Sequence, residues 1–258
     1  MNGAFYLGAT SLQAHQRALE TIANNVANIN TNGFKRSSVR FVDLVSPPSR
    51  DLPPTTRTLS SDSQTASGVQ ATASPRIFEQ GQLRNTGRLT DVAIDGDGFL
   101  ELLGPEGRLL LWRGGGIRVN GDGYLAADNG LPLKALIEVP QDAGDVSIAR
   151  DGRVTAQIAG QSDQLELGRI DIAQVRDATA LEALGGGLFG LVDEADATVS
   201  RPDEDGNGAL VQGSLESSNV DLNNEIVGLL LMQRAYAAGA QLVQAGDQLM
   251  AIANNLRR

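Results

Sequence analysis

The chain has 258 residues, of which 41% are hydrophobic and 4% aromatic, and its formal net charge is −10. The charge is uneven, since residues 1–118 carry 12 basic and 10 acidic side chains, whereas residues 119–258 carry 9 and 21. An acidic chain without a basic stripe is a poor candidate for binding nucleic acid. Because the chain has no cysteine, disulfides, thiolate catalysis and cysteine metal sites are excluded.

The sequence also speaks against membrane insertion and against a conventional signal peptide. No run of 18 apolar residues occurs, so no membrane span is expected. The first basic residue is Arg17, and no clear small-residue cleavage site follows the start. A route out of the cytoplasm would therefore need another export system.

A long helix is predicted at the N-terminus, over residues 3–31. Apolar or small residues and one histidine recur there at alternating spacings of three and four: Phe5, Gly8, Leu12, His15, Leu19, Ile22, Val26 and Ile29. This spacing places them on one face of a helix. The pattern stops at Asn32-Gly33, and glycine readily adopts the positive φ that ends many helices.

A second long helix is predicted over residues 221–256, about 54 Å in length. Its main stripe follows a strict heptad: Leu231, Ala235, Ala238, Leu242, Ala245, Leu249, Ile252 and Leu256. A second stripe lies beside it: Leu222, Ile226, Leu229, Tyr236, Ala240, Val243 and Met250. Ser218, Asn219 and Asp221 are suitable N-caps, and Glu225 suits the first turn. We expect the two terminal helices to pair along these stripes in a coiled-coil-like domain.

The apolar face of the second helix is too wide for one partner helix to cover. We therefore expect other long helices, some of them from other chains, to cover the remainder. The alternative is that the helix is buried inside its own globule.

The middle of the chain is predicted to be an all-β module over residues 77–213, which makes the fold α+β. Short apolar runs alternate with Asp-Gly and Asn-Gly breaks, which are strong hairpin signals. Residues 43–76 are rich in Ser, Thr and Pro and are predicted to be an extended linker or arm. The predicted division is 1–42, 43–76, 77–213 and 214–258, and we expect the module of residues 77–213 to fold without the helices.

Candidate chemical sites are few. Three acidic, glycine-rich clusters at 95–98, 120–123 and 203–208 could suggest calcium, but turn residues explain them better. The single histidine, His15, lies on a helical stripe and is expected to be a packed residue. No two carboxylates stand out as a glycosidase pair. We expect no catalytic residue, no metal ligand and no cofactor, and hence no enzyme.

An asparagine-rich segment from Ala23 to Lys35 contains five asparagines between positions 24 and 32. It closely resembles the N-terminal signature of bacterial flagellar rod and hook proteins, Ala-Asn-Asn-(Leu/Val)-Ala-Asn-x-x-Thr-x-Gly-Phe-Lys. The segment from Asp91 to Phe99 is similar to the central block of that family, with Leu100 in place of a second aromatic residue. Gly213–Asp221 and the run Gln233-Arg234-Ala235-Tyr236 resemble its C-terminal block, although residues 237–241 depart from the usual continuation.

The resemblance implies a structural subunit of the flagellar basal-body rod. Length and the 43–75 segment favour the distal rod over the proximal rod, which stays an alternative. Such subunits stack in a helical tube that transmits torque across the periplasm, with the terminal helices inside and the β module outside. The implied partners are copies of the chain, neighbouring rod and hook subunits, L- and P-ring proteins and the flagellar type III export apparatus, which exports the chain uncleaved.

The residues expected to pack between or within subunits lie on both helices and in the asparagine-rich signature. They are Leu12, Leu19, Ile22, Asn24, Asn25, Val26, Asn28, Ile29, Gly33, Phe34, Leu231, Ala235, Tyr236, Ala238, Leu242, Leu249, Ile252 and Leu256. Two rival hypotheses remain open from the residues alone. One is an extracellular β-rich binding module on a coiled-coil stalk, and the other is a glycan-cleaving enzyme.

Overall fold

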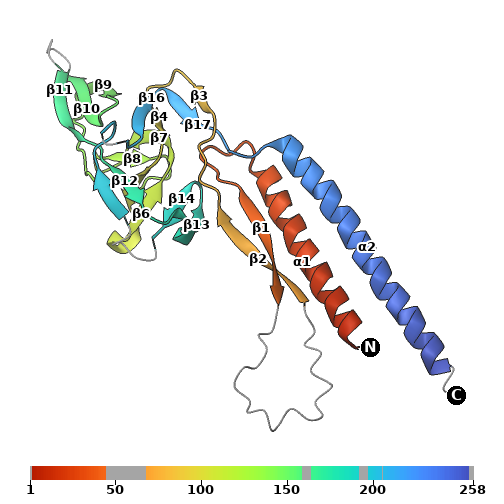
Figure 1. Cartoon of the computed structure of the whole chain (residues 1–258). Helices are drawn as coiled ribbons and strands as arrows, with labels where there is room; N and C mark the ends of the chain where they lie inside the picture. The colour runs from red at the N-terminus through yellow and green to blue at the C-terminus, as the bar shows by residue number, and fades with distance from the viewer. Residues whose placement is uncertain (1, 45–67, 159–163, 192–196, 205, 256–258) are drawn as a thin grey trace, which may run out of the picture. The chain divides into compact units, whose positions relative to one another are not determined.

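The computed structural model describes residues 2–44, 68–158, 164–191, 197–204 and 206–255. The chain divides into two compact units (Figure 1). The helical unit comprises Met1–Ala27, Ser37–Ser74 and Asp221–Arg258, and the β unit comprises Asn28–Arg36 and Pro75–Val220. The fold is α+β with a β-rich middle, as predicted.

The two helices form close to the predicted positions. Helix α1 spans Asn2–Ala27 and helix α2 spans Leu222–Asn255. Asp221 caps α2, because its Oδ1 accepts hydrogen bonds from the amides of Asn223 and Asn224 at 2.9 and 3.3 Å. Helix α1 ends four residues before the predicted residue 31. A turn replaces its last predicted turn, in which the Thr31 amide donates to the Asn28 carbonyl at 3.1 Å.

Within the helical unit, α1 and α2 pack side by side through glycines (Figure 1). A Cβ atom added to Gly8 would lie only 2.6 Å from Cγ2 of Val243. One added to Gly239 would lie 3.2 Å from Cδ2 of Leu12. The missing side chains therefore let the two helix backbones approach each other closely.

Strands β1 (Ser37–Leu44) and β2 (Gly68–Arg76) form a two-stranded sheet, and β1 packs on α1. The predicted linker or arm of residues 43–76 is thus a paired strand from Gly68 onward, because Val69 to Ala73 can extend beside β1. Residues 45–67 of that predicted segment lie outside the described residues.

The β unit contains strands β3 to β17 in short segments. They are β3 Leu83–Asn85, β4 Asp91–Asp95, β5 Phe99–Leu103, β6 Leu109–Trp112, β7 Gly114–Val119, β8 Leu125–Ala127, β9 Ala143–Ile148, β10 Arg153–Ile158, β11 Gln164–Arg169, β12 Ile172–Val175, β13 Glu182–Gly185, β14 Leu188–Gly190, β15 Ala197–Ser200, β16 Ala209–Gln212 and β17 Ser214–Glu216. They form sheets in the orders β13-β14-β6-β5-β12-β15, β16-β4-β7-β8, β11-β10-β9 and β17-β3.

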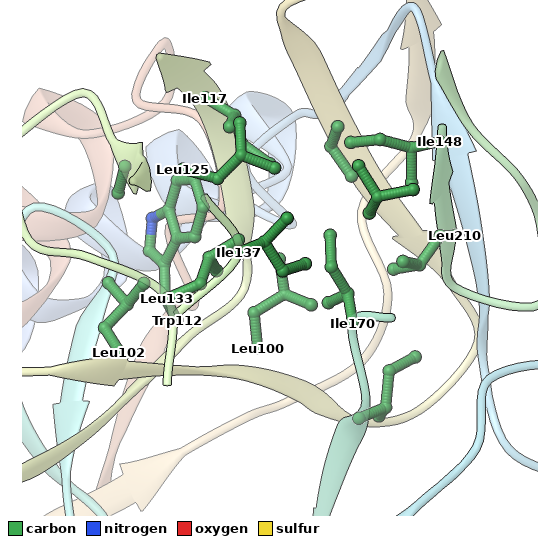
Figure 2. Close-up of a cluster of buried hydrophobic side chains, with 14 of the residues drawn as sticks. Leu100, Leu102, Trp112, Ile117, Leu125, Leu133, Ile137, Ile148, Ile170 and Leu210 are labelled. Carbon is green, nitrogen blue, oxygen red and sulfur yellow. The ribbon is translucent and has the colours of Figure 1, made fainter. Parts of the chain in front are cut away.

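The core of the β unit lies between these sheets. Figure 2 shows Trp112 among leucine and isoleucine side chains that come from several different strands and loops. Leu100, Leu102 and Leu210 have no exposed surface. A second cluster joins the rings of Phe78, Phe99 and Phe189, whose centroids lie 5.1 to 5.7 Å apart. This core is sizeable, as the hydrophobic content of the chain predicts.

The Asp-Gly hairpin signal is confirmed at Asp151-Gly152, since β9 and β10 pair in antiparallel fashion with Ile148 opposite Val154. The turn at 120–123 likewise joins the paired strands β7 and β8. The segment 95–98 behaves differently, because β4 and β5 belong to different sheets. Gly98 has a φ of +127°, and a Cβ there would lie 2.1 Å from Cγ2 of Ile172. Glycine therefore permits the close approach at which the chain changes sheets.

The compact β unit has wider bounds than the predicted module of residues 77–213. It includes Asn28–Arg36 from the N-terminal signature and extends to Val220. The amide of Gly33 donates to the Glu216 carbonyl at 2.8 Å, and the amide of Asn219 donates to the Phe34 carbonyl at 3.3 Å. Both ends of the predicted helical domain thus contribute backbone to the β unit.

Candidate assembly surface

The heptad stripe of α2 is exposed rather than buried against α1. The exposed fractions are 56% for Leu231, 73% for Leu242, 66% for Leu249 and 56% for Ile252, and Ala238 is also exposed. Pairing of α1 along this stripe is therefore not confirmed in the single chain, whereas Val243 of the second predicted stripe does meet Gly8 of the predicted α1 stripe. The reason is geometric: Gly228, Gly239 and Val243 face Ile22, Leu12 and Gly8 of α1, and glycines permit a closer approach than the leucines would.

Three sides of α2 can be distinguished because successive residues turn by about 100°. One side contacts α1 and includes half-buried Leu229, Met232 and Val243. The heptad stripe lies on a second side and is apolar. A third side carries exposed glutamines: Gln233, Gln241, Gln244 and Gln248. The apolar stripe thus faces a different direction from both the α1 contact and the glutamines.

The other predicted packing residues occupy mixed positions. Leu12, Leu19, Ile22, Val26, Ile29 and Ala235 are half-buried. Asn24 is exposed, Tyr236 is 41% exposed, and Leu256 lies outside the described residues. Asn28 is half-buried, and its side-chain oxygen accepts from the Thr31 hydroxyl at 3.2 Å.

Asn25 is buried and joins three segments of the helical unit. Its Nδ2 donates to the Ser37 carbonyl at 2.8 Å, and its Oδ1 accepts from the Ser37 amide at 3.0 Å. The same Nδ2 donates to Oε1 of Glu225 at 3.1 Å, and Glu225 lies in the first turn of α2. Because this buried side-chain amide makes two hydrogen bonds to the Ser37 backbone and one to Glu225, it fixes how α1, β1 and α2 meet.

The last residues of the asparagine-rich segment, Gly33 to Lys35, belong to the β unit. Gly33 has a φ of +67°, and Phe34 is buried beneath the guanidinium of Arg76, whose Cζ lies 5.1 Å from the ring centroid. Lys35 is 1% exposed, which is unusual for lysine. Its Nζ donates to Oε1 of Glu216 at 2.6 Å and to the Glu79 carbonyl at 2.8 Å.

Arg113 completes what we call the charge node, defined as Lys35, Arg113 and Glu216. Arg113 Nε donates to Oε2 of Glu216 at 2.8 Å, and its two terminal nitrogens donate to the carbonyls of Gly98 and Gly96. Side-chain exposure in the node is 1%, 3% and 2% for Lys35, Arg113 and Glu216. Two buried cations therefore share one buried carboxylate.

Burial and the Glu216 carboxylate shift the pKa of Lys35 in opposite directions. Burial is the largest influence on the Lys35 ammonium and lowers its pKa from the ordinary 10.5. The Glu216 carboxylate acts against this lowering, whereas the nearby charge of Arg113 adds to it. Lys35 is thus held charged mainly by one carboxylate that it shares.

This lowered pKa predicts a pH-dependent difference between the wild type and a Lys35→Met variant. As the pH rises through the lowered pKa towards 10.5, the unfolded chain binds more protons at Lys35 than the folded chain does. The free energy of unfolding of the wild type, relative to that of the Lys35→Met variant, must therefore increase with pH in that window. Urea unfolding of both proteins at several alkaline pH values measures this difference. If the free energy of unfolding of the wild type falls relative to that of the variant as the pH rises, the lowered pKa of Lys35 is contradicted.

The charge node was not predicted from the sequence, and neither were Gly228 and Gly239 of the α1–α2 contact, whereas Gly8 lies on the predicted stripe of the first helix. Lys35 and Glu216 belong to segments that resemble the N-terminal and C-terminal blocks of the family, and no role was predicted for Arg113. The available signal was a single charge beside large apolar residues, as in Trp112-Arg113 and Leu215-Glu216.

Two of the positions considered from sequence as candidate chemical sites have other contacts in the structure. Asn120 Oδ1 accepts from the amides of Asp122 and Tyr124 at 3.0 and 2.9 Å, which confirms a turn at that cluster. No group of three or more His, Asp or Glu side chains is placed to hold a metal within the described part of the chain. His15 packs against Phe41, with ring centroids 5.8 Å apart.

By length and composition, the segment Leu222–Ile252 of α2 could cross a membrane. A single such helix is weak evidence of a span. An assembling helix whose apolar side is covered by other chains has a similar composition.

A long terminal helix with an exposed apolar stripe, in a chain that also folds a β unit, defines the class of structural subunits that assemble through their helices. The comparisons agree with this class. The family of flagella basal body rod proteins matches residues 5–35, the D1 domain of the flagellar hook protein FlgE/F/G matches residues 93–156, and the C-terminal part of flagellar basal body rod FlgEFG proteins matches residues 211–256.

Similar proteins cover 94% of this chain or more. The flagellar basal-body rod protein FlgG of Borreliella burgdorferi is 34% identical over 100% of both chains. The FlgG of Agrobacterium fabrum is 36% identical over 96% of this chain and 97% of its own. The FlgF of Caulobacter vibrioides is 28% identical over 94% and 93%. The chain belongs to the flagellar basal-body rod protein family.

Proposed function

We propose that the chain is a structural subunit of the distal rod, which assembles with its own copies into a helical tube and transmits torque across the periplasm. The higher identity to FlgG proteins, 34% and 36% in two cases, compared with 28% to a FlgF protein, supports the distal over the proximal position. The protein acts by assembly and is not an enzyme.

The observation that carries this proposal is the exposed heptad stripe of α2. In the tube, this stripe packs on helices of neighbouring copies in a coiled-coil-like seam. Burial of apolar surface contributes roughly 25 cal/mol per Å², so a stripe along a 34-residue helix strongly favours association. Heterologous contacts that do not close on themselves produce a helical assembly.

The remaining partners follow from the proposed position in the rod. The subunit contacts neighbouring rod and hook subunits at the two ends of the tube, and its β unit faces the L- and P-ring proteins. The flagellar export apparatus delivers the chain uncleaved. Residues 119–258 carry 21 acidic and 9 basic side chains, a balance that disfavours adhesion to anionic membranes.

Deleting the gene is expected to leave cells non-motile, with basal bodies arrested at the rod stage and without hooks. Without this subunit, the surface on which later subunits assemble is missing. Electron microscopy of isolated basal bodies measures the result, and re-expression of the wild-type chain serves as the control. Complete hooks on the deletion strain would show that the chain is not an essential rod subunit and would favour the β-rich binding module instead.

A further inference from the structure

Asparagine followed directly by glycine is a dipeptide that can lose its side-chain amide without an enzyme. The backbone nitrogen of the glycine attacks the side-chain carbon Cγ of the asparagine, and a succinimide ring forms. Glycine favours this step because it has no side chain to crowd the attacking nitrogen. The β unit contains four such pairs: Asn32-Gly33, Asn120-Gly121, Asn129-Gly130 and Asn207-Gly208. The contacts of each glycine nitrogen therefore decide which of these pairs reacts in the folded chain.

In three of the four pairs, a hydrogen bond holds the glycine amide. The amides of Gly33, Gly130 and Gly208 donate to the carbonyls of Glu216, Ala127 and Asp97 at 2.8, 2.8 and 3.0 Å. An amide that is held in this way must first break its hydrogen bond, in a local opening of the fold, before its nitrogen attacks. The asparagines of these three pairs are therefore protected.

The amide of Gly121 is different, since it donates no hydrogen bond among the described residues. Gly121 is exposed, and a Cβ atom added to it would meet no atom within 4 Å. Asn120 itself is half-buried, whereas Asn129 is exposed. Exposure alone would therefore favour reaction at Asn129, but the free glycine amide favours Asn120.

The side chain of Asn120 is also arranged to support the attack. Its Oδ1 accepts hydrogen bonds from the backbone amides of Asp122 and Tyr124 at 3.0 and 2.9 Å. Negative charge develops on this oxygen when the nitrogen attacks Cγ, and two fixed donors at these distances stabilise that charge. The Oδ1 of Asn129 accepts from the amide of Leu131 at 3.0 Å, but the amide of its own glycine is held.

We infer that Asn120 is a site of spontaneous deamidation in the folded chain. A bond forms between the Gly121 nitrogen and Cγ of Asn120, and the bond from Cγ to Nδ2 breaks. Ammonia leaves with the proton that the glycine nitrogen gives up. Water then opens the ring at either of its two carbonyls and leaves aspartate or isoaspartate. Both products place a new carboxylate near Asp122, in the turn that joins β7 and β8.

Peptide mapping by mass spectrometry, after incubation of the full chain in mildly alkaline buffer, tests this inference. In the folded chain, the peptide that contains Asn120 should convert from amide to acid about tenfold faster than those with Asn32, Asn129 and Asn207, because only the latter need a hydrogen bond to open first. In denaturing urea the four rates should become similar, since every glycine amide is then free. Equal rates in the folded chain, or fastest conversion at Asn129, would overturn the inference. So would a preference for Asn120 that persists in urea.

Gly121→Ala is the matched variant for this experiment. The φ of Gly121 is not positive and its surroundings leave room for a methyl group, so the variant should fold like the wild type. The fluorescence of Trp112, the single tryptophan, checks this during urea unfolding. The methyl group crowds the attacking nitrogen, and conversion at Asn120 should fall to the rate of the three held pairs. A rate equal to that of the wild type would show that the Gly121 nitrogen is not the attacking atom.

Discussion

The Glu216→Gln variant is expected to lose about 3–5 kcal/mol of unfolding free energy, the usual cost of removing one partner from a buried ion pair. Glutamine keeps the shape of the side chain and still offers an oxygen to the Gly81 amide. It removes the only carboxylate of the charge node, and Lys35 and Arg113 then remain buried at 1% and 3% exposure. The loss arises from these two cations rather than from a cavity.

Urea unfolding of the full chain measures this loss through the fluorescence of Trp112, the single tryptophan, which is buried in the core of the β unit. Glu204→Gln is the matched control. Glu204 pairs with Arg201 at 3.6 Å, but both side chains are more than half exposed, so the change should stay within about 1 kcal/mol. Equal losses in the two variants would show that the buried node contributes no more than a surface pair.

Features that depend on neighbours in sequence could be predicted. The cap at Asp221, the hairpin at Asp151-Gly152 and the turn at 120–123 each follow from one or two side chains and the backbone beside them. The end of α1 was harder, because the helical apolar pattern continues to Ile29 while Asn28 and Thr31 form a turn. Local hydrogen bonds there outweigh the apolar period.

Features that depend on distant partners could not be predicted. Strands β4 and β5 follow each other across Asp95–Gly98, yet they join different sheets, because Gly96 and Gly98 allow a sharp change of direction. The face of α2 that meets α1 is set by Gly228 and Gly239, whose role lies in the absence of a side chain. A count of apolar residues favours the leucine stripe and gives these glycines no weight.

The charge node shows the same limit for polar residues. The sequence places Lys35, Arg113 and Glu216 in three separate blocks, and only the β unit brings them together. Asn25 was expected only to pack between or within subunits. Its partners Ser37 and Glu225 became evident only with the fold.

Leu242→Asp is expected to stop assembly and leave the folded single chain unchanged. Leu242 is 73% exposed, so the substitution removes little contact within the chain. If the heptad stripe packs on neighbouring copies, the same position becomes buried there, and an aspartate would place an unpaired charge in an apolar seam. The lost leucine contact and the buried charge together should weaken each subunit contact by more than about 3 kcal/mol, or more than 100-fold in affinity.

Gln244→Asp is the control for this experiment, because Gln244 is also exposed but lies on the glutamine side of α2. Both variants add one negative charge to the same helix, so they differ in the side of the helix that carries it. Urea unfolding should show equal stability for the two single chains. Sedimentation should show assembly by the Gln244→Asp protein alone, and swimming in soft agar should be lost only with Leu242→Asp. Normal assembly and motility of Leu242→Asp cells would show that the stripe is not the surface through which the subunits join.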